Sequence, residues 1–285
     1  MKNYFKILVL IIICNYTFTE TSVISKKSQD RIVSIGGSIT EILFELGLGD
    51  LVVAVDQSST FPKEVKDLPQ VGYIRAISSE GVLSMNPTKI ITTTDIGPPN
   101  AIKQIKDSGI NTQIFDSPKN IEDIVALIIE VSNLFEAKDK ASIAIKDIYK
   151  IKGSIKNLTS GYAYKPKAAF FMSPSNGSYT AAGSGTNANY LIELIGGDNV
   201  FSNDFRRYQK VNKEEILKYD PDIILVASHY PGQKSSSHFT EEPIFKSLSC
   251  IKKKNIINIS MSDLTMGPSF VSNALSIAKR VNIDK

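Results

Sequence analysis

A long segment without proline in the middle of the chain most constrains what this sequence can fold into. From Ile121 to about Leu158 there is no proline and only one glycine, Gly153, while apolar residues recur at helical spacing. The segment is much longer than an ordinary helix of about 11–12 residues. We therefore predict two helices here, the second of which forms a rigid bridge between the parts of the chain on either side.

Strand and helix patterns alternate before this segment. Arg31–Ile35 predicts a strand, which is followed by a helix over Ile39–Leu46 and a strand over Leu51–Val55. Ser38 and Glu41 have the spacing of a capping box at the start of the first helix. Short strands that alternate with helices are typical of a parallel, doubly wound sheet.

The same alternation continues up to the long segment and resumes after it. The further predicted elements are helices over 78–85, 99–108, 187–195, 213–218 and 268–281, and strands over 89–93, 112–115, 168–172, 222–227 and 255–259. We therefore predict an α/β protein with two doubly wound lobes, joined by a long rigid helix, with a ligand cleft between the lobes. The expected boundaries are residues 30–136 for the N-terminal lobe, 137–160 for the bridging helix and 161–285 for the C-terminal lobe.

The N-terminus has the pattern of an export signal. A basic start is followed by the apolar run Ile7–Cys14 and by a polar stretch rich in Ser and Thr. The apolar run is too short to span a bilayer, which needs about 20 residues. We assign residues 1–24 to a secretory signal peptide, with a buried N-terminal strand as the alternative, and we expect a periplasmic protein. A lipid anchor on Cys14 is disfavoured, because Ile13 stands where such sites have a small residue.

Charge and cysteine content narrow the class of protein further. Lys and Arg exceed Asp and Glu by 33 − 29 = 4, and the two signs are interspersed along the chain. This balance is too mild for a nucleic-acid-binding protein. Cys250 is the only cysteine that remains after a signal peptide of this length, so an internal disulfide is excluded. We expect a soluble monomer that is stabilised by its hydrophobic core.

Motifs of enzymes are sparse, and we predict that the protein is not an enzyme. Gly183–Ala188 fits a loose dinucleotide-binding pattern, but it follows only a weak strand, so a turn packed closely on the cleft is the favoured interpretation. No P-loop, nucleophile elbow or zinc-peptidase motif occurs. His229 and His238 lack neighbouring cysteines or acidic clusters and form a poor metal site, although His229 directly follows a strand at the mouth of the expected cleft.

Tyr73 is the residue with the most chemical content. In an extended segment, residues two positions apart face the same side, so Tyr73 and Arg75 can reach one ligand together. A phenolate suits ferric haem iron, and a nearby guanidinium either lowers the pKa of the phenol or pairs with a haem propionate. The alternative is a tyrosine packed at the edge of a lobe beside a surface arginine.

Several segments resemble the periplasmic haem-binding proteins of haemin ABC importers. The segments are Arg31–Glu41, Val71–Arg75 with Ser79–Ser84, and Gly97–Pro99. These proteins belong to the binding proteins with a helical backbone, whose other members carry cobalamin and siderophores. The resemblance runs from about residue 30 to the end of the chain and is densest in the first lobe. The tyrosine motif is the part that is specific to haem carriers.

The resemblance implies roles for individual residues. Tyr73 would be the axial ligand of the haem iron, and Arg75 would be the partner of a propionate or of the phenolate. Glu80 and Glu214 resemble the acidic residues with which the two lobes dock onto arginine pockets of a membrane permease. A glutamate in the first turn of a helix is also common without any partner, because the helix dipole favours it.

The sequence departs from haem carriers at two places. His229 follows Ser228 where these proteins often have an arginine, and we expect it either to hydrogen-bond a propionate or to approach the distal face of the haem. The segment Met172–Gly183 contains no histidine, which favours five-coordinate iron. We therefore expect a protein that captures haem as its transported ligand and delivers it to an ABC permease in the inner membrane. The alternatives are a binding protein for cobalamin or a ferric siderophore, and an exported α/β enzyme.

Overall fold

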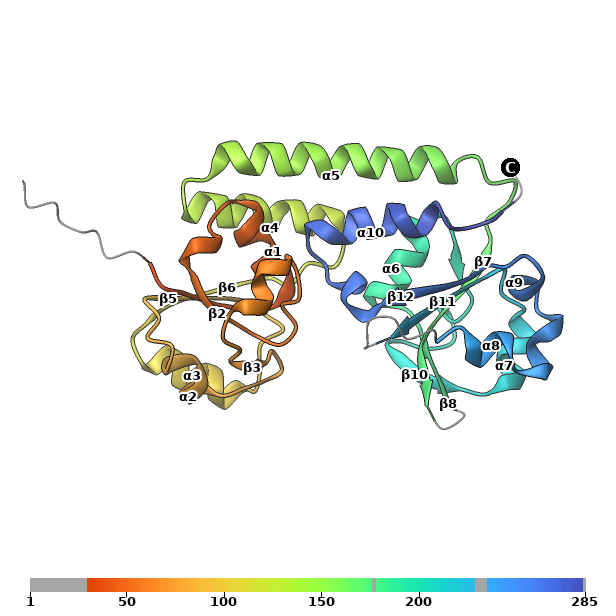
Figure 1. The fold of residues 1–285 in the computed structure, drawn as a ribbon, viewed down its shortest axis with the longest axis horizontal. Helices are drawn as coiled ribbons and strands as arrows, with labels where there is room; N and C mark the ends of the chain where they lie inside the picture. The colour runs from red at the N-terminus through yellow and green to blue at the C-terminus, as the bar shows by residue number, and fades with distance from the viewer. Residues whose placement is uncertain (1–29, 176–177, 229–234, 284–285) are drawn as a thin grey trace, which may run out of the picture.

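The computed structural model describes residues 30–175, 178–228 and 235–283, which form two α/β lobes joined by a long helix (Figure 1). The first lobe contains the strands β1 (Ile32–Ile35), β2 (Val52–Val55), β3 (Gly72–Tyr73), β4 (Ala76–Ile77), β5 (Lys89–Thr93) and β6 (Asn111–Phe115). Its helices are α1 (Gly37–Glu45), α2 (Ser79–Leu83), α3 (Pro99–Asp107) and α4 (Ile121–Leu134), with short 3-10 turns at Gly49–Leu51 and Lys63–Asp67.

The sheet of the first lobe is parallel and is covered on both faces. Its strand order is β2-β1-β5-β6, and every neighbouring pair is parallel. Ile32 packs in a hydrophobic cluster with α1 and α4, whereas Val33 and Ile35 pack in a second cluster with α2 and α3. Side chains alternate between the two faces of a strand, and both faces of this sheet are covered, so all four residues of β1 are buried. The doubly wound arrangement predicted for this lobe is confirmed.

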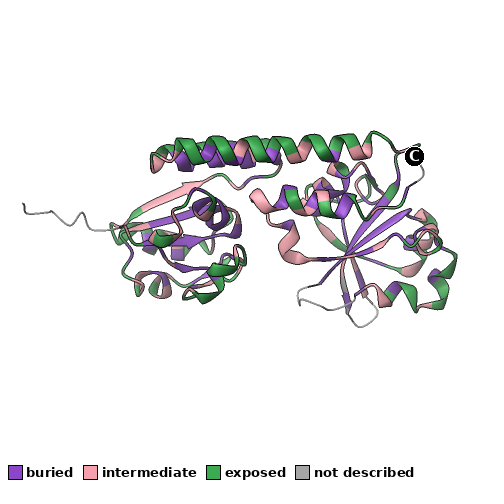
Figure 2. Cartoon of the chain, turned by 45° about the horizontal axis from the view of Figure 1, so that its top comes forward, coloured by how far each residue is buried: buried purple, intermediate pink, exposed green. Residues whose placement is uncertain are grey.

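Two helices occupy the long proline-free segment, as its pattern predicted. α4 ends at Leu134 and α5 (Lys138–Thr159) begins four residues later, after Glu136 has turned the backbone with a φ of +56°. The buried residues of α5 share one face, which packs against α4 and α10. Figure 2 shows the opposite face exposed. The buried residues are Ala141, Ala144, Ile148 and Ile155. This face belongs to a single hydrophobic cluster that runs through both lobes.

The second lobe is built on a mixed sheet. Its strands are β7 (Lys167–Ser175), β8 (Ser178–Ala182), β9 (Asp198–Asn199), β10 (Tyr208–Val211), β11 (Ile223–Ser228) and β12 (Ile256–Ser260). Its helices are α6 (Asn187–Leu194), α7 (Lys213–Tyr219), α8 (Ser237–Thr240), α9 (Ser249–Lys252) and α10 (Pro268–Ala278), with 3-10 turns at Pro243–Ser247 and Met261–Leu264. The strand order is β10-β8-β7-β11-β12, in which β8 is antiparallel to both of its neighbours.

The capping box predicted for α1 is wrong. α1 begins after Gly36, and no side chain caps it. Glu41 is only 4% exposed and accepts hydrogen bonds from the backbone N and the Oγ of Ser269, at 3.0 and 2.9 Å. Ser269 lies in the first turn of α10, in the second lobe. Glu41 therefore connects the two lobes and does not stabilise the start of its own helix.

The structure bears on two further features of the sequence. Cys250 is a buried, free cysteine, and burial raises the pKa of its thiol to about 12, so it remains protonated at neutral pH. Within the described ranges, no helix combines the length and the apolar character needed to cross a membrane. The signal peptide assigned to residues 1–24 lies outside the described residues.

Candidate ligand-binding site

Tyr73 and Arg75 lie on a tight β-hairpin of the first lobe. Tyr73 pairs with Ala76 and Gly72 pairs with Ile77, which leaves Ile74 and Arg75 as the two residues of the turn. The expected extended segment is therefore a turn. The difference arises because the side chain of Ile74 is only 7% exposed and packs into the core of the lobe, so the chain reverses at this point.

Backbone hydrogen bonds hold this hairpin to the rest of the first lobe. Gly97 N donates to Ile74 O and Ile77 N donates to Gly97 O, each at 2.9 Å, and Gln57 N donates to Gly72 O at 2.8 Å. A Cβ atom on Gly36 would lie 3.1 Å from Cδ1 of Ile74, and Gly36 has a φ of +117°. Glycine at position 36 thus permits the close packing of Ile74, and the hairpin has a firm base.

The side chains of Tyr73 and Arg75, the two candidate site residues on the hairpin, are accessible. Tyr73 is 46% exposed, and Arg75 is also exposed. Among the residues that the structure describes, neither the Tyr73 hydroxyl nor the Arg75 guanidinium has a hydrogen-bond or ion-pair partner. A phenol and a guanidinium that bind no protein group are free to bind iron and a carboxylate, respectively.

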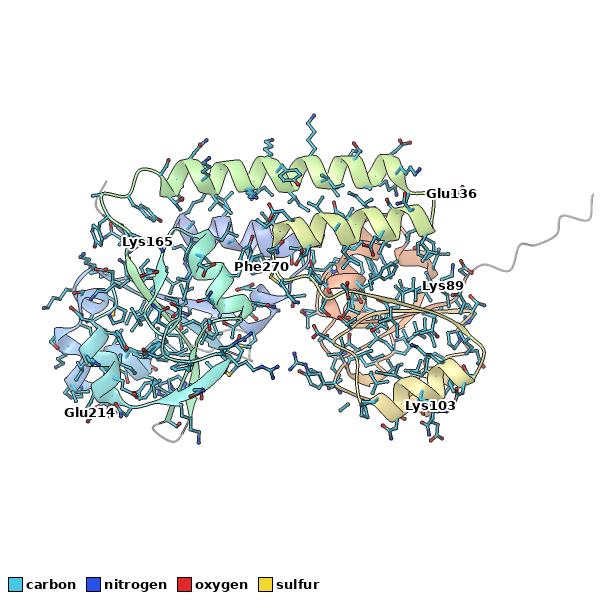
Figure 3. All side chains as sticks on the ribbon, turned by 180° about the vertical axis from the view of Figure 1, so that it is seen from behind. Lys89, Lys103, Glu136, Lys165, Glu214 and Phe270 are labelled. Atoms are coloured by element: carbon cyan, nitrogen blue, oxygen red, sulfur yellow. The ribbon has the colours of Figure 1, made fainter. Side chains whose placement is uncertain are left out.

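Tyr208 brings the second lobe into the same site. Burial raises the pKa of Tyr208, while the Thr186 hydroxyl and the Arg75 guanidinium lower it in part. Arg75 of the first lobe is therefore close enough to act electrostatically on a residue of β10. Figures 1 and 3 show β10 at the edge of the second lobe that faces the first, and Figure 1 shows β3 on the facing side of the first lobe. Sequence reasoning missed Tyr208, because the strand of four residues around it is too short to be recognised by its periodicity.

The glycine-rich segment Gly183–Ala188 is explained by the packing of its backbone. Gly183 N donates to Arg207 O at 2.7 Å, and Ser184 N donates to Phe205 O at 3.0 Å. A Cβ atom on Gly183 would lie 2.1 Å from Phe205 O, so no other residue fits there without moving the backbone. The segment is a turn held against residues 205–207, which is the alternative that we favoured over a dinucleotide site.

The two glutamates assigned to docking lie on exposed helices. Glu80 is in the first turn of α2 and Glu214 is in the first turn of α7, and both are exposed. Figure 1 shows both helices on the side of the molecule opposite α5, and Figure 3 shows Glu214 on that side. In the described part of the chain neither carboxylate forms an ion pair, although Lys213 next to Glu214 binds Glu242 at 2.9 Å.

Of the two histidines, the structure describes only His238. His229 lies outside the described residues, and His238 is exposed on α8. No group of three or more histidine, cysteine or acidic side chains that could hold a metal ion occurs among the residues with a described position.

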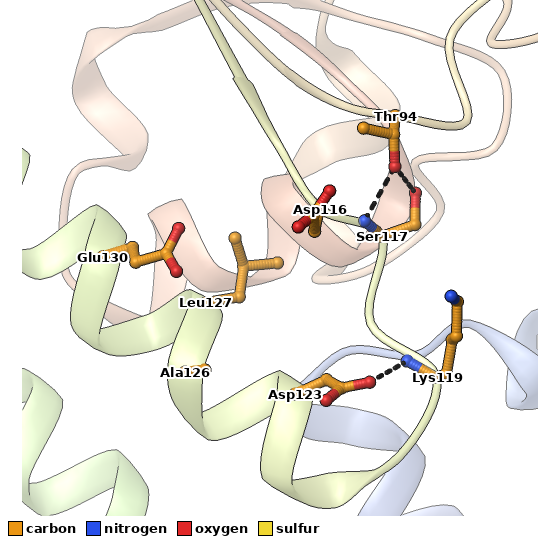
Figure 4. A pocket seen from close by; sticks show the side chains of 8 residues that line it. All are labelled: Thr94, Asp116, Ser117, Lys119, Asp123, Ala126, Leu127 and Glu130. Carbon is orange, nitrogen blue, oxygen red and sulfur yellow. Dashed lines mark hydrogen bonds between the residues drawn. The ribbon is translucent and has the colours of Figure 1, made fainter.

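A separate pocket of the first lobe is acidic (Figure 4). It is formed where β5 and β6 end beside α4, and its lining residues are Thr94, Asp116, Ser117, Lys119, Asp123, Ala126, Leu127 and Glu130. Thr94 accepts a hydrogen bond from Ser117 N at 3.1 Å, and Asp123 accepts one from Lys119 N at 3.0 Å. Three carboxylates against one lysine disfavour an anionic ligand here.

Comparison with known proteins identifies the family. Residues 32–261 match the periplasmic binding protein family. The chain belongs to this family. A vitamin B12-binding protein of Vibrio cholerae serotype O1 is 26% identical over 224 residues, which cover 78% of this chain and 80% of the relative. An uncharacterized ABC transporter substrate-binding lipoprotein of Bacillus subtilis is 27% identical over 267 residues, which cover 91% of this chain and 82% of the relative.

A solved structure shares the fold of this periplasmic binding protein. The apo periplasmic haem-binding protein of Roseiflexus sp. RS-1 is similar with a TM-score of 0.80 and 27% sequence identity, over 89% of this chain and 98% of that one. The predicted family resemblance and the two-lobed α/β fold are therefore confirmed. The protein is a solute-binding protein of the ABC import type, and such carriers are not enzymes.

Proposed function

We propose that this periplasmic binding protein captures haem between its two lobes and delivers it to the membrane permease of an ABC importer. The observation that carries the proposal is the Tyr73 phenol, which is 46% exposed and unpaired among the described residues, on a firmly held hairpin beside Arg75. Tyrosine is an axial ligand of ferric haem in other proteins, and a guanidinium pairs with carboxylates such as the haem propionates.

The other proposed site residues act around the bond between the Tyr73 oxygen and the haem iron. Arg75 pairs with a propionate or with the phenolate, and His229 contacts a propionate. Residues 30–136 and 161–285 form the two lobes, and residues 137–160 form the bridge between them. Because α5 is continuous over Lys138–Thr159 and packs within a hydrophobic cluster shared by both lobes, only small lobe movements accompany binding. The chain is exported through residues 1–24 and acts in the periplasm as a monomer.

Cobalamin is the second candidate ligand, because a relative is named as a vitamin B12-binding protein. Cobalamin does not need a phenolate ligand from the protein. The free phenol and the free guanidinium of the hairpin support haem, which offers both a ferric iron and carboxylates.

A titration of the mature protein with haemin and with cyanocobalamin tests the proposed ligand. We expect haemin at micromolar concentration to shift its Soret band and to develop the bands of a high-spin ferric phenolate, because the Tyr73 oxygen binds the iron. We expect no binding of cyanocobalamin in the same range by calorimetry. Binding of cyanocobalamin without binding of haemin would show that the protein carries a corrinoid and not haem.

A second prediction concerns the docking residues. The double substitution Glu80→Ala with Glu214→Ala should weaken association with the reconstituted permease by about tenfold to a hundredfold, because each lobe loses a carboxylate that pairs with a permease arginine. Haemin affinity should stay unchanged, because neither carboxylate belongs to the proposed contacts with haem. Asp147→Ala on the exposed face of α5 is the control that removes an acid elsewhere. Undiminished permease association of the double variant would rule out this docking mode.

A further inference from the structure

A buried aspartate, Asp56, lies where two strands of the first lobe end. Asp56 directly follows β2, and Gly36 directly follows β1, which pairs in parallel with β2. The Asp56 side chain is 0% exposed, and within residues 30–175, 178–228 and 235–283 no basic side chain forms an ion pair with it. A buried carboxylate without a cation needs hydrogen bonds from neutral groups to offset the loss of water.

Four hydrogen bonds from described residues reach this carboxylate. Gly36 N and Ser59 Oγ donate to Oδ1 at 2.8 and 2.7 Å. Ser58 N and Ser58 Oγ donate to Oδ2 at 2.9 and 2.6 Å. Two bonds to each oxygen fill the acceptor sites of a carboxylate. Asp56 therefore holds the residue that precedes α1 and the loop after β2 together.

A chain of buried hydroxyls extends this network to α1 and β1. Ser59 Oγ lies 2.8 Å from Thr40 Oγ1, which in turn lies 2.7 Å from Ser34 Oγ. A hydroxyl has one proton, and that of Ser59 goes to Asp56, so Thr40 donates to Ser59. Ser34 then donates to Thr40 for the same reason. All three hydroxyls point their protons toward the carboxylate, which is the final acceptor of the chain.

The segment around the aspartate also carries the strand that leads to Tyr73. Val71 N donates to Val55 O at 2.9 Å. Gln57 N donates to Gly72 O at 2.8 Å, immediately before Tyr73. The residues on either side of the aspartate thus bind this strand, and the backbone position of Tyr73 depends on where they are held.

Gly36 is the second support of the hairpin. Ile74, next to Tyr73, packs so closely on Gly36 that a Cβ atom there would lie 3.1 Å from Cδ1 of Ile74. Because Asp56 binds Gly36 N and is the residue before Gln57, one carboxylate fixes both backbone segments on which the hairpin rests. A side chain that binds a ligand must be held within about 0.5 Å of its productive position.

We infer that Asp56 is a positioning residue for Tyr73: its carboxylate holds the hairpin at the place from which the phenol oxygen reaches the ligand. The inference rests on the proposed function and adds a residue that touches neither the ligand nor Tyr73 itself. Asp56 acts through the backbone, as an outer partner of a metal ligand acts through the ligand that it orients.

The substitution Asp56→Asn tests this role, because it keeps the shape of the side chain. Its amide NH2 is a donor and opposes either the N–H of Gly36 or that of Ser58. We expect the ferric phenolate bands of the haem complex to lose intensity and haemin affinity to fall by about tenfold, the lower end of the effect of a lost outer partner. Without haem, the amides of Gln57 and Val71 should exchange hydrogen faster than in the wild type.

Asp222→Asn is the matched control in the second lobe. Asp222 is 8% exposed and accepts hydrogen bonds from Lys167 N and the Tyr164 hydroxyl, each at 3.1 Å. Its replacement should lower the temperature of thermal unfolding, as Asp56→Asn does, and leave the spectrum, the haemin affinity and the exchange at the hairpin unchanged. Should Asp56→Asn not fold, Ser58→Ala removes only the bond from Ser58 Oγ and should change the bands and the exchange in the same direction, by less.

The outcomes separate this role from the function on which it rests. Wild-type bands and affinity in a folded Asp56→Asn protein, or in Ser58→Ala if Asp56→Asn does not fold, overturn the role of Asp56 and leave the proposed function standing. Equal losses in Asp222→Asn overturn it too, because general destabilisation would then explain them. Unchanged exchange of Gln57 and Val71 overturns it even if affinity falls. A wild type that does not bind haemin overturns the proposed function and the inference together.

Discussion

Replacing Tyr73 with phenylalanine is expected to abolish the ferric phenolate bands of the haem complex and to weaken haemin binding by more than about a hundredfold. Loss of an outer partner of a metal ligand already lowers metal affinity by about 10- to 100-fold, and here the ligand atom itself is removed. The fold should tolerate the change, because the Tyr73 hydroxyl has no partner among the described residues. Visible titrations measure the affinity, and urea unfolding should give a stability within about 0.5 kcal/mol of the wild type.

Tyr149→Phe is the matched control for this substitution. Tyr149 is 47% exposed, almost the same as Tyr73, but it lies on α5. Removal of the Tyr149 hydroxyl should leave both the spectrum of the haem complex and the haemin affinity unchanged. If the wild type binds haemin and the Tyr73→Phe protein has the same spectrum and the same affinity, Tyr73 is not the iron ligand.

A second large effect is expected in the pH dependence of stability, through Glu41. Burial raises the pKa of Glu41 from 4.5 to about 7; the hydrogen bonds from Ser269 lower it in part, and the charge of Glu45 raises it. Between these two values the folded protein keeps a proton that the unfolded chain has released. The resulting stabilisation is fully present below the unfolded pKa of 4.5, and it is lost as the pH rises through the folded pKa of about 7. This difference corresponds to about 3 kcal/mol.

The substitution Glu41→Gln should remove this contribution. The amide stays neutral at every pH, and its oxygen can still accept a hydrogen bond from Ser269. Urea unfolding at a series of pH values between about 4.5 and 8 should show a decline in the free energy of unfolding that is up to about 3 kcal/mol smaller in the variant. Glu64→Gln, at an exposed position of the first lobe, should keep the decline of the wild type. If Glu41→Gln also keeps the full decline, another group is responsible for it.

Glu41 also illustrates where local reasoning from the sequence fails. Ser38 and Glu41 have the spacing of a capping box, yet the partner of Glu41 is Ser269, which is 228 residues away. Gly267 leaves room for the carboxylate, since a Cβ atom there would lie 2.5 Å from Oε2 of Glu41. A spacing rule considers only neighbours along the chain, so it cannot anticipate a buried contact between two lobes.

The sequence by itself determined the order of the longer strands and helices, the two-helix segment over residues 121–158 and the choice of Tyr73 and Arg75 as candidate site residues. These features follow from local periodicity, from the chemistry of single side chains and from a resemblance to known carriers. Only the tertiary structure decided that Tyr73 and Arg75 lie on a tight hairpin, that β8 and β10 run antiparallel at the edge of the second sheet, and that Tyr208 of the second lobe lies near Arg75 of the first. The reason is physical: these arrangements depend on packing between segments that are far apart in the chain, and no local pattern records which segments will meet.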